Sequence, residues 1–362
     1  MSREERLSEN TAPALLHADG SHRYAIDYTR QDGTHLGAVP IIPDFQTARD
    51  WTSFMGVRRG QLPAFTATAK GVVSPLWCDE RGEPYCRGFR VETTNADGSE
   101  TIRCDFPKSY FKSLAEHGSR AWVGKGELDV GELYAYQVCA YPVASDVPET
   151  NALDAQTDQP AGFEIEAVPE RIPLVTSRLD GFMERVTAKG PLTDGDMPVF
   201  LAQSVIDEAC ALTREAGKNE TGGILVGKIH EDPSKPEVFI EVVAQIPAKH
   251  AEATSSSFSF SHETWSAADA AIELRGRGEL TLGWWHSHPR FCNPECTEAR
   301  WKDCLLASPF FSADDIHLHR ICFPQPYQVA LLISDLPASG PTPAFFGWKA
   351  GTISTRGYFT TA

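Results

Sequence analysis

The feature that most constrains this chain is an apolar strand that ends in two histidines. Residues 280–285 form an apolar run typical of a buried strand. His286 and His288 follow that run directly, and Pro289 ends it. Because residues i and i+2 of a strand point to the same side, both imidazoles can bind one metal ion. A lone pair of this kind is also common as two polar residues at a strand end.

A carboxylate and a hydroxyl lie further along the chain. Asp315 stands at the start of the next periodic segment, three residues after Ser312. With the two histidines, Asp315 could complete a three-ligand set that leaves an open position on zinc, which is typical of catalytic sites. Ser312 and Asp315 also fit a capping box at a helix start, which needs no catalysis. The residues alone leave both interpretations open.

A second carboxylate stands well upstream. Glu220 precedes Gly222 and Gly223, which lead into an apolar strand. A carboxylate beside a metal-bound water can take its proton and pass it to a leaving amine. Taken alone, Glu220 is better explained as a solvated loop acid. The combination of Glu220, the two histidines and the Ser312–Asp315 pair is far more specific than any one part.

This combination resembles the JAMM, or MPN-plus, metallopeptidases in their prokaryotic JAB form. The resemblance covers roughly residues 190–362 and implies an α/β fold, a sheet flanked by helices. It implies that Zn²⁺ is bound by His286, His288 and Asp315. Glu220 would then be the general acid/base, and Ser312 would stabilise the oxyanion. One departure is the long stretch that separates the histidines from Ser312, where the family has a short spacer.

The resemblance also implies a function. We expect a zinc metallopeptidase, a deubiquitinase-like isopeptidase or peptidase that cleaves after the C-terminus of a ubiquitin-like protein. Deconjugation and precursor processing are both compatible with this chemistry. Expected partners are the ubiquitin-like protein, its conjugates, and cognate activating and conjugating enzymes, in a bacterial anti-phage system. The alternatives are a non-catalytic MPN-type scaffold, or a JAB hydrolase that acts on a small-molecule or sulfur-carrier adduct.

The stretch between the histidines and Asp315 carries cysteines. A second, structural zinc site could be formed by Cys292, Cys296, Cys304, His317 and His319. The alternative is that the cysteines are buried or surface thiols and the histidines are ordinary helix residues. A zinc deaminase is excluded, because that class uses a glutamate where the second histidine stands here.

Length and charge bound the organisation. A chain of 362 residues suits two domains. We expect a β-rich N-terminal domain of unknown role at 1–142, an acidic linker at 143–168 and the metallopeptidase domain at 169–362. A net charge of −16 argues against nucleic-acid binding. Without a signal peptide or a membrane-length apolar run, we expect a cytoplasmic protein that holds its nine cysteines reduced.

Hydrophobic periodicity predicts the individual elements. Strands are expected at 24–28, 89–93, 134–138, 223–229, 237–245, 255–260, 327–333 and 344–348. Helices are expected at 107–117, 198–216, 262–274 and 315–320. Gly118 is expected to end the first of these helices. Residues 45–54 fit either an amphipathic helix or simple core packing.

Overall fold

The computed structural model describes most of the chain, and the chain divides into two compact units. The described residues are 22–62, 71–95, 98–143, 173–193, 195–249, 251–254, 258–290, 308–336 and 339–361. One unit comprises Met1–Thr52 and Thr68–Pro169, and the other Ser53–Ala67 and Glu170–Ala362. The predicted linker at 143–168 lies almost wholly outside the described residues. Its boundaries therefore stay predictions.

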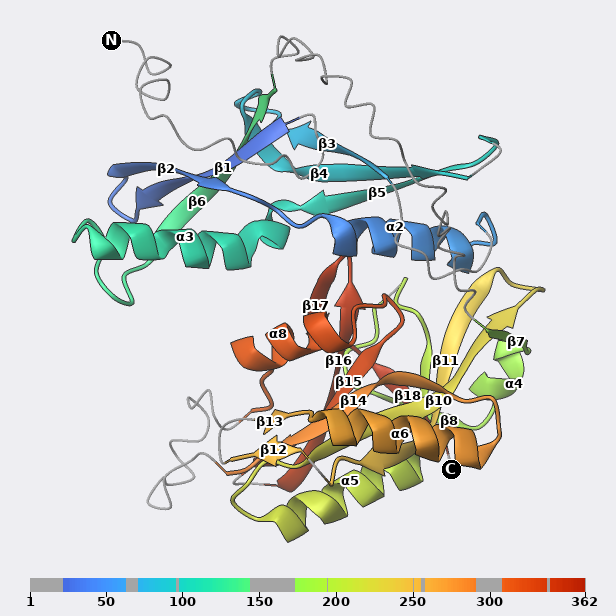
Figure 1. Ribbon diagram of the computed structural model, residues 1–362. Helices are drawn as coiled ribbons and strands as arrows, with labels where there is room; N and C mark the ends of the chain where they lie inside the picture. The colour runs from blue at the N-terminus through green and yellow to red at the C-terminus, as the bar shows by residue number, and fades with distance from the viewer. Residues whose placement is uncertain are drawn as a thin grey trace, which may run out of the picture. The chain divides into compact units, whose positions relative to one another are not determined.

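The N-terminal unit is built on an antiparallel sheet. Its strands are β1 (His22–Arg30), β2 (His35–Ile41), β3 (Val72–Trp77), β4 (Tyr85–Thr94), β5 (Thr101–Pro107) and β6 (Tyr134–Pro142). The strand order is β2-β1-β6-β4-β3, and β5 pairs with β4. Helix α3 (Lys112–Gly124) follows the short 3-10 helix η1 (Lys108–Phe111) and packs against β1 and β2 (Figure 1). A helix also covers the 45–54 stretch, as part of α2 (Gln46–Arg58).

The helix predicted at 107–117 differs from α3 in where it ends. Gly118 lies inside α3, which continues to Gly124, so the prediction that Gly118 ends the helix is wrong. A Cβ atom at Gly118 would lie 2.3 Å from the hydroxyl oxygen of Tyr28. Glycine at this position therefore allows close packing of the helix on β1, and it does not act as a stop signal.

The C-terminal unit is built on a curled, mixed sheet. Its strands are β7 (Leu174–Thr176), β8 (Val186–Lys189), β9 (Val199–Ala202), β10 (Gly222–Asp232), β11 (Glu237–Pro247), β14 (Leu280–His288), β15 (Val329–Leu336), β16 (Gly340–Lys349), β17 (Thr352–Thr355) and β18 (Tyr358–Thr361). The order is β17-β16-β15-β14-β10-β11-β9-β18-β8, with β7 on β10. The short strands β12 (Glu252–Ala253) and β13 (Phe258–Ser259) pair separately. Strand β14 therefore lies inside the sheet, with a neighbour on each side.

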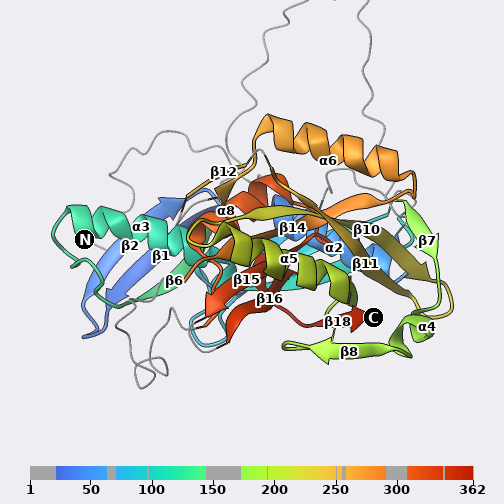
Figure 2. The ribbon, with the colours of Figure 1, turned by 90° about the horizontal axis from the view of Figure 1, so that it is seen from below.

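Helices cover both faces of this sheet. They are α4 (Leu179–Met183), α5 (Gln203–Ala216), α6 (His262–Arg275) and α8 (Ala313–Cys322). On one face, Trp284 forms a core cluster with Ala268 of α6 and with Phe323, which directly follows α8. On the other face, the Trp285 indole donates to Gln245, whose amide donates to Glu208 of α5. Figure 2 shows α5 and α6 well apart, with strands of the sheet between them.

Most predicted elements of this unit agree with the structure, and one does not. The mixed α/β class with a separate β-rich N-terminal sheet is confirmed. The helix predicted at 198–216 begins only at Gln203, because residues 199–202 form β9 between β11 and β18. A short apolar run that is buried on both faces does not distinguish strand from helix by periodicity alone. Among the described residues, no helix has both the length and the hydrophobicity to cross a bilayer.

Candidate metal centre

Strand β14 positions the two histidines. His286 lies opposite Gly222 of β10 and Leu332 of β15, so neighbouring strands hold its backbone on both sides. Its side chain is fully buried, and that of His288 is 4% exposed. The two Nε2 atoms lie 3.1 Å apart. The alternation of the strand thus brings both imidazoles to one point, as expected.

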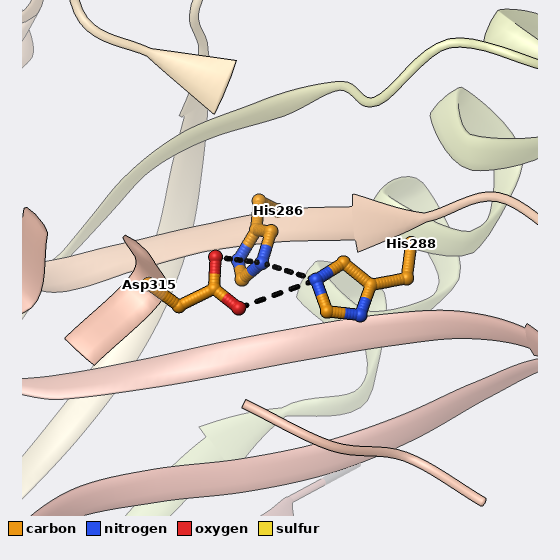
Figure 3. Close-up of side chains that lie close together, drawn as sticks. All are labelled: His286, His288 and Asp315. Atoms are coloured by element: carbon orange, nitrogen blue, oxygen red, sulfur yellow. Dashed lines mark hydrogen bonds and ion pairs between the residues drawn. The ribbon is translucent and has the colours of Figure 1, made fainter. Parts of the chain in front are cut away.

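The start of α8 positions the carboxylate. The Asp315 backbone N–H donates to the Ser312 hydroxyl at 3.1 Å, and the Ser312 N–H donates to the Asp315 carboxylate at 2.7 Å. The same carboxylate reaches Nε2 of His286 at 3.0 Å and Nε2 of His288 at 3.3 Å (Figure 3). The capping box and the metal-ligand interpretation are therefore not alternatives, because the box holds Asp315 where it meets the imidazoles.

These three side chains fit a divalent metal ion. Among the described residues they are the one His/Cys/Asp/Glu group whose ligand atoms lie within 4.8 Å of one another. Two imidazoles and one carboxylate are ligands that zinc takes, at about 2.0–2.2 Å from the ion. Atoms at that distance from one tetrahedral ion are separated by roughly 3.3 Å, close to the separations found here. Such a set leaves one coordination position open.

Burial and charge shift the pKa values of His286 and Asp315. Burial lowers the pKa of His286, against the opposing attraction of Asp315, which favours the neutral imidazole that binds metals. Burial alone would raise the pKa of Asp315. The imidazoles of His286 and His288 outweigh burial and hold the pKa of that carboxyl below its ordinary value. Asp315 is therefore held as a carboxylate, and burial favours the neutral form of His286, which are the forms that bind a cation.

Glu220 lies at the entry to β10, beside the ligands. Its N–H donates to the Thr254 carbonyl at 2.8 Å, and its side chain is 6% exposed. A Cβ atom at Gly222 would lie 2.5 Å from the Trp285 carbonyl oxygen, and one at Gly223 would lie 2.4 Å from that of Ile246. The two glycines are therefore required so that β10 can pass close to β14 and β11 immediately after Glu220.

Burial also changes the acidity of Glu220. Its pKa is raised to about 7, first by burial and then by repulsion from Asp315 and Asp314, while His288 lowers it. Burial raises the pKa of Glu220 and His288 lowers it, and the effect of burial is larger. A carboxyl that titrates near neutral pH can both accept and donate a proton, as a general acid/base must.

The residue between the histidines was not singled out by sequence analysis. Ser287 is fully buried, and its hydroxyl accepts a hydrogen bond from the Thr221 N–H at 3.0 Å. In return, the Ser287 N–H donates to the Thr221 carbonyl at 2.7 Å. Ser287 thereby links the metal-ligand strand to the residue that follows Glu220. Its sequence signal is weak, because the importance of Ser287 depends on which loop lies opposite it.

Aromatic side chains surround the imidazoles. The Trp284 indole stacks on His286 with ring centroids 4.4 Å apart, and Phe311 lies 5.8 Å from the same ring. Phe310 lies 4.9 Å from the His288 ring. These walls lower the local dielectric constant, which strengthens electrostatic interactions within the site.

The structure separates the two histidines that we considered for a second zinc site. His317 is exposed, whereas His319 is fully buried and accepts a hydrogen bond from the Trp284 indole at 3.0 Å. Residues i and i+2 of a helix do not face each other, so the two rings cannot share an ion. Cys292, Cys296 and Cys304 lie outside the described residues. A site built from these cysteines and one of the two histidines therefore stays a prediction.

Comparison with known proteins agrees with the site. Residues 202–293 match the family of prokaryotic homologs of the JAB domain, a span that includes Glu220, His286 and His288. Among solved structures, the chain is similar to protein DSY2949 from Desulfitobacterium hafniense at 23% identity. That match covers 45% of this chain and 92% of the other, with a TM-score of 0.32. A search of curated proteins finds no match. The family match and the buried His286–His288–Asp315 group are consistent with a JAMM-type metallohydrolase, and residues 202–293 of the C-terminal unit are similar to prokaryotic JAB domains.

Proposed function

We propose that this protein is a zinc-dependent isopeptidase or peptidase that cleaves after the C-terminus of a ubiquitin-like protein. The observation that carries the proposal is a buried carboxyl, Glu220, with a pKa raised to about 7 beside a converging His286–His288–Asp315 group. A purely structural metal site needs no such acid, and a scaffold needs neither.

Each residue has a role in this chemistry. His286, His288 and Asp315 would hold the metal ion, which when bound supplies a Lewis acid and lowers the pKa of a water molecule. Glu220 would take a proton from the attacking water and deliver it to the leaving amine. The Ser312 hydroxyl accepts from the Asp315 N–H, and its own hydrogen donates to no acceptor among the described residues. That hydrogen is free to donate to the developing oxyanion.

The substrate class rests on the family resemblance and on the leaving group. A general acid/base that can protonate a leaving amine suits the cleavage of an amide bond. If the leaving amine is a lysine side chain, that amide is an isopeptide bond. We propose a ubiquitin-like protein and its conjugates as partners. The enzyme would act in the cytoplasm, in a bacterial anti-phage system, by deconjugation, by precursor processing or by both.

The decisive experiment compares three substrates that differ in the acyl group and in the amine that leaves. The full chain with one equivalent of zinc is incubated with ubiquitin joined to the lysine side chain, with a linear ubiquitin fusion, and with the acetylated lysine peptide. Mass spectrometry is expected to find free ubiquitin and free peptide from the first two substrates. Cleavage of the acetylated peptide alone would instead indicate a small-acyl hydrolase.

A matched variant separates catalysis from contamination. Glu220→Gln keeps the shape of the side chain and removes its acid/base function, so it should bind zinc and fail to cleave. If zinc-loaded wild type and Glu220→Gln cleave at equal rates, the proposal is wrong. The ubiquitin-like proteins encoded beside bacterial JAB genes should be tried as substrates in the same format.

A further inference from the structure

His319 is a buried titratable residue that the proposed chemistry does not use. It is fully buried, and its Nδ1 accepts a hydrogen bond from Nε1 of Trp284, which is also fully buried, at 3.0 Å. The bond joins α8 to β14, and its two residues are 35 positions apart in the sequence. The Trp284 N–H and the His319 Nδ1 therefore satisfy each other, while the buried Nε2 of His319 has no partner among the described residues.

Trp284 connects this bond to a metal-ligand residue. Its indole lies parallel to the His286 ring, with centroids 4.4 Å apart and an interplanar angle of 11°. A pivot of the indole would break the hydrogen bond from its N–H to His319, so this bond adds to the ring packing that fixes the indole. The orientation of the His286 ring is thus coupled to a residue that lies outside the ligand group.

Helix α8 also links His319 to a metal-ligand residue, Asp315. Asp315 and His319 are four residues apart in this helix, so they share one face. Asp315 reaches the imidazoles at 3.0 and 3.3 Å, and His319 reaches Trp284 one turn later. Helix α8 therefore contacts the metal-ligand strand at two points. Fixing the second point restricts both the rotation and the sliding of the helix that presents Asp315.

We propose that His319 is a positioning residue, which aligns Asp315 through α8 and His286 through Trp284 for metal binding and catalysis. This inference rests on the proposed function for its catalytic part only. Metal affinity is sensitive to the groups that orient the ligands, and losing one typically weakens affinity about 10–100-fold. His319 suits the role because burial lowers its pKa to about 3, so the neutral acceptor form persists across the neutral pH range.

The test separates the acceptor of His319 from its ring. His319→Phe removes the acceptor, whereas His319→Asn places an amide oxygen near the position of Nδ1. Zinc affinity is measured in the full chain by competition with a chromophoric chelator. We expect about 10–100-fold weaker binding for His319→Phe and recovery to within about threefold for His319→Asn. With a ubiquitin–lysine substrate, kcat should fall in His319→Phe while KM changes little.

Three further variants separate the loss of this bond from a general loss of folding. Trp284→Phe removes the donor and keeps an aromatic ring on His286, and it should weaken zinc binding as His319→Phe does. The double variant should be little worse than either single one, because both remove the same bond. Ile321, 64% exposed on the same helix, provides a control, and Ile321→Ala should retain wild-type zinc affinity.

The outcomes are separable. Equal zinc affinity for wild type and His319→Phe would overturn the inference, and so would equal losses for His319→Phe and His319→Asn. If zinc affinity follows the predicted pattern but no substrate is cleaved, the proposed function fails and the positioning of the metal ligands by His319 stands.

Discussion

The two units bury different kinds of side chain. In the described part of the N-terminal unit, the buried polar side chains are those of Thr52 and Thr93. Its core is aromatic instead, as in the Phe89–Phe106 stack with centroids 4.9 Å apart. The C-terminal unit buries a cluster of ionisable groups: Glu220, His286, His288, Asp315 and His319.

This difference distinguishes stability from function. An aromatic core gains free energy from every ring that it removes from water. Buried acids and imidazoles lose hydration, so a fold retains them where they are paired, as Glu279 is with Arg275, or where they bind a ligand or perform chemistry. The contrast shows that apolar packing dominates the described core of the N-terminal unit, whereas part of the C-terminal core consists of ionisable groups that could hold a cation.

The strongest test of this contrast removes one ligand. His288→Ala should abolish stoichiometric zinc and reduce kcat/KM by at least about 10³-fold, because the lost Lewis acid contributes several kcal/mol. Zinc is counted by atomic emission, and cleavage is measured with the ubiquitin–lysine substrate. A variant that keeps both zinc and activity would remove the functional half of the comparison.

Replacing the acid should leave the metal in place. Glu220→Gln should lower kcat by about 10²–10⁴-fold, the usual contribution of general acid–base catalysis, while zinc content stays at wild type. The measurement pairs single-turnover kinetics with metal analysis. Loss of zinc in this variant would instead make Glu220 part of metal binding.

The complementary test truncates the aromatic core. Phe89→Ala should lower the free energy of unfolding by about 3–5 kcal/mol, the usual loss for a buried phenylalanine. At low temperature, where the variant is folded, its zinc affinity should equal that of wild type. Urea unfolding and chelator competition measure the two quantities, and a parallel fall in zinc affinity would contradict the contrast.

The metal-free protein should show the strain of burying Glu220. An acid whose pKa is raised on folding holds its proton more tightly in the folded state, so stability falls as pH rises from 4.5 to about 7. Glu220→Gln lacks this loss and should be more stable than wild type by on the order of 1–3 kcal/mol at pH 8. At pH 4 the two proteins should unfold alike, and the same gain at both pH values would exclude this cause.

The smallest expected effect concerns the link between Ser287 and Thr221. Ser287→Ala leaves the Thr221 N–H without its acceptor, at a cost of about 1–3 kcal/mol. We expect kcat to fall about tenfold as Glu220 loses its alignment, with zinc affinity nearly unchanged. Ser287→Thr keeps a hydroxyl and should recover most of the rate.

Several features of the fold were predictable because they arise from short-range patterns. The apolar run before His286 predicted a buried strand, and the Ser312–Asp315 spacing predicted a helix start; both are found. The sequence predicts a helix over residues 199–202, which form β9, because four apolar residues fit the helical and the strand periodicity equally well. The meaning of Gly118 was also missed, because its reason is the Tyr28 hydroxyl on another element.

The amino-acid sequence by itself determined which atoms are available to a metal ion: two imidazoles two positions apart on a strand, and a carboxylate held by a capping box. Strand alternation and helix capping are local, so such groups can be identified without a fold. Only the tertiary structure decided that Asp315 meets those imidazoles, that Ser287 pairs with Thr221, and that His319 serves Trp284 and does not join His317. Those contacts join residues distant in the chain, and sheet register and helix docking, not local pattern, determine them.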